Sequence, residues 1–280
     1  MDRAILQDIE LDYEVRGAGE PVVLVHAGVC ADWFKQFLDE PALADRYRLL
    51  SYHRPGYANS GQPSGPVSIA QQAVYCRLMM QHVGIDRAHI VGHSNGGMIA
   101  LQMALDYPDA VQSLVLLESA RPGAGDAPGE EAFLATVAQP ALRHYAAGDH
   151  AAAVEAWMIG TCGPDYRAAL EQRLPPGAFA QAVADADTFF GNDLPGVRAW
   201  TLTREDAARI TQPVLAVLGA KTSDVTPTFE LRREVLLAWL PDVEAFDLPG
   251  ATHLLHLQNP RGLAEGMAAF FERHPISPTA

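Results

Sequence analysis

Several kinds of feature are scarce in this sequence, and each scarcity narrows the class of protein. There are three cysteines, an odd number at spacings that fit no zinc pattern, so we expect neither a disulfide framework nor a metal site. Lys and Arg number 20 against 34 Asp and Glu, which gives a formal net charge of −14. This acidic balance argues against nucleic acid or anionic membranes as partners.

Long apolar runs are also missing. No stretch approaches the roughly 18 apolar residues of a membrane span, and the first residues lack the apolar segment of a signal peptide. We therefore expect a cytoplasmic protein. No nucleotide motif is evident, so we expect no cofactor, and the expected partner is a small-molecule substrate. Whether the chain forms a homodimer is left open.

What the sequence does contain is a regular alternation of strand and helix patterns over 280 residues, 49% of them hydrophobic. Continuous apolar runs such as Val22–Val25 and Val214–Leu218 are typical of strands buried on both faces of a parallel sheet. Helices are expected between the strands, including residues 33–43 and a helix from an N-cap at Ser68 to about His82. The pattern predicts an α/β fold with helices on both faces, whose parallel strands all end at one ligand-binding edge.

One long segment breaks the alternation. Residues 121–210 lack strand signals and have the composition of a series of helices. Because the strand pattern resumes at residue 211, we expect a core formed by residues 1–120 and 211–280, with 121–210 inserted as a helical cap. Such a lid would exclude water from the ligand-binding edge and shape its pocket.

The pentapeptide Gly92-His93-Ser94-Asn95-Gly96 is the strongest single motif. An apolar run precedes it, and a helix-like stretch follows it. This context is typical of a sharp strand-to-helix turn that exposes a serine nucleophile, because the two glycines leave room for the bend. The start of the helix also supplies backbone N–H groups that favour a developing oxyanion. The motif therefore predicts Ser94 as a nucleophile.

A serine nucleophile needs a base within hydrogen-bond reach. Of the ten histidines, His253 is the best placed, because the loop after the last expected strand lies at the same edge as Ser94. His256, three residues further on, is the competing candidate. His26 and His93 flank the turns at this edge, and we interpret them as pocket residues and not as bases.

Five segments together resemble the α/β-hydrolase superfamily: His26-Ala27-Gly28, the loop from His53 to Ser60, Gly-His-Ser-Asn-Gly-Gly at 92–97, Pro-Val-Leu-Ala-Val-Leu-Gly at 213–219 and Leu-Pro-Gly-Ala-Thr-His at 248–253. The resemblance implies a mostly parallel, eight-stranded sheet and an oxyanion hole of two backbone N–H groups. One of these groups falls on Asn95, and the other on Gly28, with Val29 as the neighbouring option. A serine nucleophile departs from the haloalkane dehalogenase and epoxide hydrolase branches, which carry aspartate there.

The acid that would orient His253 has two candidates. In much of the superfamily it is an aspartate about three residues after the glycine that ends the Val214 strand, a position occupied here by Thr222. Asp224 lies two residues later, and a longer loop could bring it back. Glu118 is the rival, because it follows a buried apolar strand directly, where some members of the superfamily place the acid, and a carboxylate there needs a partner.

Together these residues predict a serine hydrolase acting through a Ser-His-acid triad and an acyl-enzyme. The expected substrate is a small, largely apolar carbonyl compound such as an ester, thioester or lactone, because the candidate pocket residues are mostly apolar. The fold also hosts lyases, cyclases and cofactor-free oxygenases, and a non-catalytic ligand receptor is a further alternative. The candidate pocket residues are His26, Val29, Cys30, Trp33, His93, Trp157, Phe189 and Phe190.

Overall fold

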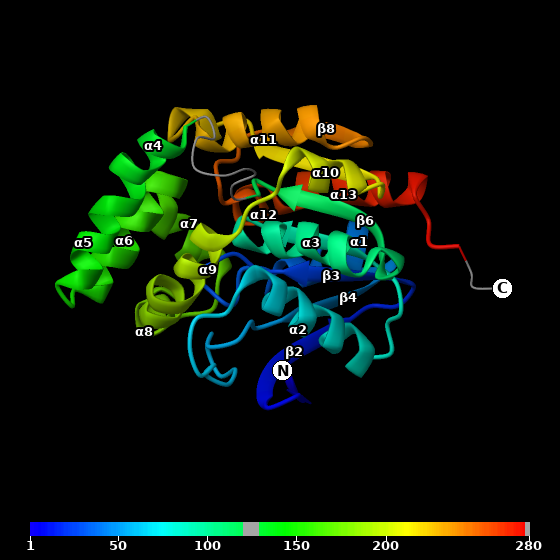
Figure 1. Cartoon of the computed structure of the whole chain (residues 1–280), viewed down its shortest axis with the longest axis horizontal. Coiled ribbons are helices and arrows are strands. Elements are labelled where there is room, and N and C mark those ends of the chain that lie inside the picture. Colours follow the sequence, from blue (N-terminus) through cyan, green and yellow to red (C-terminus); the bar gives the residue numbers. More distant parts are fainter. Residues whose placement is uncertain (120–128, 278–280) are drawn as a thin grey trace.

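An eight-stranded sheet forms the centre of the molecule (Figure 1). The computed structural model describes residues 1–119 and 129–277. The strand order is β1-β2-β4-β3-β5-β6-β7-β8. The strands are β1 (Asp2–Leu6), β2 (Ile9–Arg16), β3 (Glu20–Val25), β4 (Tyr47–Tyr52), β5 (Ala88–His93), β6 (Val111–Leu117), β7 (Val214–Gly219) and β8 (Val243–Leu248).

Five of the seven strand pairings are parallel. Only β1 with β2 and β2 with β4 run antiparallel, which confirms the expected mostly parallel sheet. Because parallel strands end at the same edge, the segments that follow β3, β5, β6 and β7 meet there. These segments contain Gly28, Ser94, Glu118 and Thr222.

Alternating side chains of the strands pack on opposite faces of the sheet. Val22 and Leu24 of β3 belong to one apolar core, and Val23 and Val25 belong to the other. Helices therefore cover both faces, as expected. The first face packs against α1 (Pro41–Ala44) and α13 (Pro260–Arg273), and the second against α2 (Ile69–His82), α3 (Asn95–Asp106) and α11 (Thr228–Trp239).

The helical segments differ in one place from what the sequence pattern predicts. Ser68 does cap α2, with its side chain accepting a hydrogen bond from the backbone N–H of Gln71. The helix expected over residues 33–43 is wrong: this segment consists of turns, a 3-10 turn at Phe37–Asp39 and the short α1. Pro41 has no N–H to continue a helix from the preceding turn, so it starts a new one instead.

Between β6 and β7 the described residues form helices and no strand. These are α4 (Glu130–Phe133), α5 (Gln139–Ala146), α6 (His150–Cys162), α7 (Tyr166–Arg173), α8 (Ala178–Ala184), α9 (Leu194–Ala199) and α10 (Arg204–Arg209), with π-helical turns at η3 (Leu134–Ala138) and η4 (Asp187–Asp193). Helices α4 to α8 gather beyond one end of the sheet (Figure 1). The expected boundary near residue 120 lies outside the described residues.

No helix in residues 1–119 or 129–277 combines the length and apolar character required to cross a bilayer. Helix α12 (Leu255–Gln258) follows the loop after β8.

Candidate active site

Ser94 occupies a strained turn between β5 and α3. Its φ of 52° and ψ of −114° lie in a region that residues with a side chain rarely adopt. A Cβ on Gly92 would lie 2.3 Å from the carbonyl oxygen of Gly96, and one on Gly96 would lie 2.2 Å from that of Val25. The two glycines are therefore required by close backbone contacts, as the Gly-x-Ser-x-Gly pattern predicts.

The turn after β3 faces the same site. Gly28 lies against the ring of Phe189, because a Cβ on Gly28 would come within 2.3 Å of Cε2 of that ring. Val29 has a φ of 73°, which is unusual for a β-branched residue and marks a second strained position in the site. Gly28, Val29 and Asn95 all line one pocket with Ser94, so both candidate oxyanion turns meet at the serine.

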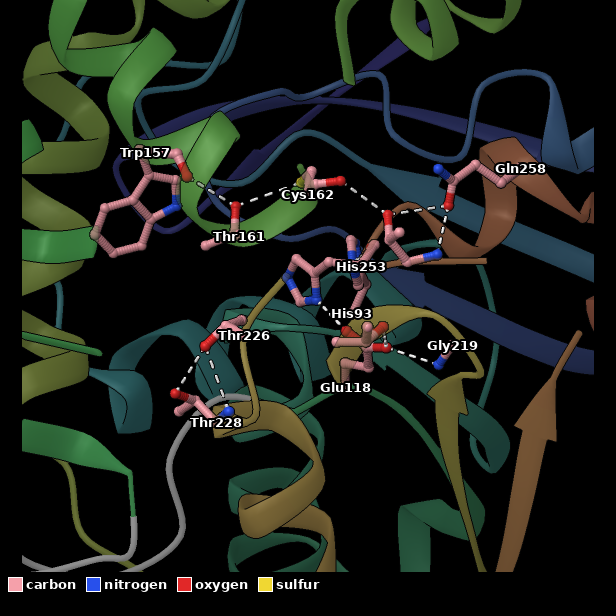
Figure 2. Close-up of polar contacts among 12 residues, drawn as sticks. His93, Glu118, Trp157, Thr161, Cys162, Gly219, Thr226, Thr228, His253 and Gln258 are labelled. Carbon is pink, nitrogen blue, oxygen red and sulfur yellow. Dashed lines mark hydrogen bonds and ion pairs between the residues drawn. The ribbon is translucent and has the colours of Figure 1, made fainter. Parts of the chain in front are cut away.

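His253 is held by Glu118. The Nδ1 atom of His253 lies 2.6 Å from Oε2 of Glu118, whose side chain is fully buried. The other carboxylate oxygen accepts hydrogen bonds from the backbone N–H of Gly219 (2.7 Å) and the hydroxyl of Thr222 (2.5 Å). Figure 2 shows the Glu118 carboxylate between His253 and Gly219. The buried charge is thus supported on both oxygens.

Asp224 is not brought to His253. It is exposed in the 3-10 turn Thr222–Asp224, and among the described residues no hydrogen bond joins its side chain to His253. Its expected return through a longer loop does not occur, because the turn directs it to solvent. Thr222, at the superfamily's usual acid position, contributes instead a hydroxyl that donates to Glu118.

Two further histidines surround His253. His93 places Nε2 2.9 Å from the carbonyl oxygen of His253, and its ring lies 4.7 Å from those of both His253 and His256. Burial, and then the neighbouring histidines, hold the pKa of His93 well below its usual value. His256 is 2% exposed beside Trp33 and Phe34, and burial lowers its pKa to about 3. A base this weak and enclosed is a poor alternative to His253.

Two adjoining pockets open beside the serine. The larger has a volume of about 610 Å³, open mouth included, and the smaller about 320 Å³. Both are lined by Ser94, Asn95, Trp157 and Thr161. His253 lines the smaller pocket, so the candidate nucleophile and the candidate base face one space.

Most predicted pocket residues do line this space, but three do not. Val29, Trp33, His93, Trp157 and Phe189 line the smaller pocket. His26, Cys30 and Phe190 are buried and are absent from both linings. Both ring nitrogens of His26 form hydrogen bonds with backbone groups, and Phe190 packs on Tyr145 and Trp157. Burial raises the pKa of the Cys30 thiol, which makes it a poor nucleophile.

A second group of lining residues has no signal in the sequence. Phe229 of α11 lines the larger pocket and stacks on His253, with ring centroids 4.0 Å apart. Arg232, one turn further along α11, is buried in an ion pair with Glu130 of α4, with Nε 2.8 Å from Oε1. Which side chains of α11 face the site depends on the packing of α4 against α11, and no local sequence pattern indicates that packing.

The donor atoms of the site are suited to proton transfer. Within the described ranges 1–119 and 129–277, no cluster of three or more His, Cys, Asp or Glu side chains is arranged to hold a metal ion. The arrangement combines a strained serine, a histidine hydrogen-bonded to a buried carboxylate, and two turns that line the same pocket.

Comparison with known proteins identifies the architecture. A family model described as the alpha/beta hydrolase fold matches residues 20–260. The chain belongs to this α/β-hydrolase-fold family. Among solved structures, the enol-lactonase from Burkholderia xenovorans LB400 is similar, with a TM-score of 0.76 at 20% identity, covering 97% of this chain and 100% of that one. At this identity the likeness concerns the fold alone.

Curated relatives match this α/β hydrolase in part. A protein of Azorhizobium caulinodans provisionally named carbamate hydrolase RutD is 35% identical over 112 residues, which is 39% of this chain and 41% of that protein. The dihydrolipoyllysine-residue acetyltransferase component of the acetoin cleaving system of Pseudomonas putida is 26% identical over 269 residues, covering 94% of this chain and 66% of that protein. The chain thus spans between two fifths and two thirds of these relatives. Hydrolases recur among the curated proteins that it resembles in part.

Proposed function

We propose that this α/β hydrolase is a serine hydrolase that cleaves a small, largely apolar carbonyl substrate, such as an ester, thioester or lactone, through an acyl-enzyme. The observation that carries the proposal is the hydrogen bond from His253 to the buried Glu118, at the wall of a pocket that Ser94 also lines. A strained serine, a histidine and a carboxylate in this arrangement are suited to nucleophilic acyl transfer.

The proposed reaction assigns one role to each group. Nε2 of His253 removes the proton from Ser94 as Oγ attacks the carbonyl carbon, and Glu118 holds Nδ1–H and stabilises the imidazolium. The N–H groups of Gly28 and Asn95 stabilise the oxyanion. The imidazolium then protonates the leaving group. Water, deprotonated by His253, attacks the acyl-enzyme and releases the acid and free Ser94.

The preference for an apolar substrate is supported by the lining of the larger pocket. Phe133, Leu134, Ala138, Leu142 and Phe229 contribute apolar surface there. Its two charged members in the interior, Glu130 and Arg232, are paired with each other, so they neutralise one another. Because several of these residues and Trp157 come from the helices between β6 and β7, we also propose that this insertion acts as the lid that shapes the pocket.

A fluorophosphonate that reacts with activated serines tests the nucleophile. We expect one adduct on Ser94 in the folded protein, located by peptide mass spectrometry, and none in Ser94→Ala. Hydrolysis of a panel of p-nitrophenyl esters and lactones of increasing chain length then tests turnover. Absence of the adduct in folded protein would overturn the nucleophile, whereas an adduct without turnover of any ester, thioester or lactone would favour non-hydrolytic chemistry or a ligand receptor.

A further inference from the structure

A buried ion pair joins the helical insertion to the loop after β4. Arg54, 1% exposed, contacts the carboxylate of Asp193 with both terminal nitrogens, at 3.0 Å and 2.6 Å. Asp193, at the end of η4, is 5% exposed and also accepts hydrogen bonds from Tyr57 (2.7 Å) and Gln72 (3.2 Å). Burial opposes the charge on Arg54, yet the adjacent Asp193 carboxylate keeps its pKa above the usual value. The guanidinium is therefore charged and fixed in place.

The same guanidinium also reaches the candidate oxyanion turn. One nitrogen of Arg54 donates to the carbonyl oxygen of Ala27 at 3.1 Å. Nδ1 of His26 lies 2.6 Å from this oxygen, and Nε2 of His26 accepts the backbone N–H of Arg54 at 2.9 Å. Because Nε2 is the acceptor, the proton of the neutral ring is on Nδ1, and it is donated to Ala27. Burial holds the pKa of His26 well below its usual value, which keeps the ring neutral.

The carbonyl of Ala27 and the N–H of Gly28 belong to one peptide unit. A trans peptide is planar, so its C=O and N–H point in opposite directions and cannot turn independently. Two donors on the oxygen thus fix the direction of the N–H and increase its polarity. We infer that Arg54, held by Asp193 of the insertion, is a positioning residue that aims the Gly28 N–H at the developing oxyanion. This inference rests on the serine hydrolase function proposed above.

A purely structural ion pair would have a different signature, because it would affect stability without selectively affecting the transition state. The loop after β4 offers a matched control. Thr188, also on η4, donates to the carbonyl oxygen of Gly56 at 2.8 Å. This bond joins the same two segments but does not include the Ala27–Gly28 peptide. Removing it tests contact between insertion and core without changing the donors on Ala27.

The informative variant is Arg54→Met combined with Asp193→Leu, because replacing both members of a buried pair avoids an unpaired charge and can preserve stability. Wild type, this double variant and Thr188→Val are compared in p-nitrophenyl acetate hydrolysis and in inhibition by a trifluoromethyl ketone, whose serine adduct carries an oxyanion. We expect the double variant to lose about tenfold or more in kcat with KM little changed. The inhibition constant should rise by a similar factor, while Thr188→Val stays within about twofold of wild type in all three quantities.

Two results would overturn the inference. One is a folded double variant whose kcat and inhibition constant both remain within about threefold of wild type. The other is an equal loss in Thr188→Val, which would assign the effect to contact with the insertion in general. If the double variant does not fold, Asp193→Asn replaces it, with the same expected direction. Failure of the proposed function looks different: wild type itself then neither hydrolyses the ester nor forms the adduct at Ser94.

Discussion

The Nδ1 atom of His253 lies 2.6 Å from Oε2 of Glu118, although 135 positions separate the two residues in the chain. Glu118 has a φ of 45° immediately after β6, and this turn of the backbone accompanies the placement of its carboxylate beneath the loop after β8. In the proposed mechanism the acid thus follows β6, whereas in much of the superfamily it follows the strand that corresponds to β7.

Replacing each carboxylate by an amide distinguishes between Glu118 and Asp224, the two candidate acids in the sequence. We expect Glu118→Gln to lower kcat by about a thousandfold to ten-thousandfold, because an amide can hold the wrong tautomer of His253 and cannot stabilise its charge. Asp224→Asn should remain close to wild type. Steady-state hydrolysis of p-nitrophenyl esters measures both, and the opposite ranking would return the acid to Asp224.

The hydroxyl of Thr222 supports the buried Glu118 carboxylate and can be removed with little change of shape. Thr222→Val should lower the free energy of unfolding by about 1.5–3 kcal/mol, because a charged acceptor loses a donor inside the protein. Thr222→Ser keeps the hydroxyl and should retain most of that stability. Urea denaturation at pH 7 gives both values, and a larger loss in Thr222→Ser than in Thr222→Val would show that packing of the methyl group matters more than the hydroxyl.

Gly28 is limited by its neighbour and not by its own backbone. A Cβ there would lie 2.3 Å from Cε2 of Phe189, so Gly28→Ala should displace either the ring or the oxyanion turn. We expect kcat/KM to fall by about tenfold or more, in line with the loss of an oxyanion donor. Adding Phe189→Ala should restore part of the activity by vacating the space. A double variant no better than Gly28→Ala would place the cause in the backbone itself.

His256 should make the protein sensitive to acid. Its pKa is about 3 in the folded state, against 6.5 for an ordinary histidine, so below pH 6.5 the unfolded chain binds a proton that the folded chain does not. The stability present above pH 6.5 is then lost as the pH falls towards 3, by about 1.4 kcal/mol per pH unit for this one residue.

The variant His256→Leu should remove that dependence. Both ring nitrogens lack a hydrogen-bond partner among the described residues, so an apolar side chain of similar size should cost little at pH 7. Denaturant titrations at pH 4, 5, 6 and 7 should give a shallower fall of stability in the variant than in wild type. Parallel curves would mean that His256 is protonated in the folded protein.

The sequence predicted the parts of the site that depend on local pattern. Ser94 was predicted because close-packed glycines and a strand-to-helix change leave a readable signature, and the sheet because buried parallel strands are continuously apolar. The choice between Glu118 and Asp224 was not predictable, since it depends on where the turn at residues 222–224 directs its side chains. The helix predicted for residues 33–43 does not form. The local cause, Pro41, is visible in the sequence, but the sequence does not show that Pro41 outweighs the helix-like pattern of the surrounding apolar residues.

Contacts between residues far apart in the sequence could not be predicted, for another reason. Arg54 and Asp193 are 139 positions apart, and Glu130 and Arg232 are 102 apart. Each pair joins the helical insertion to the core, and no pattern in the sequence indicates which residues of these two parts contact one another. For the same reason Cys30 and Phe190 were assigned to the pocket. The sequence indicates that an apolar side chain lies near the site, but not whether it lines the pocket or packs in the core.

The contacts between η4 and the loop after β4 have a consequence for exchanging caps between relatives. Thr188 and Asp193 bond to groups of Gly56, Arg54 and Tyr57, so this loop is complementary to its own insertion. Replacing residues 129–209 alone with the cap of a relative would leave Arg54 facing a surface that lacks Asp193. Functional chimeras should therefore take residues 53–61 and the insertion from the same parent protein. These two segments, distant in the sequence, have to be exchanged together.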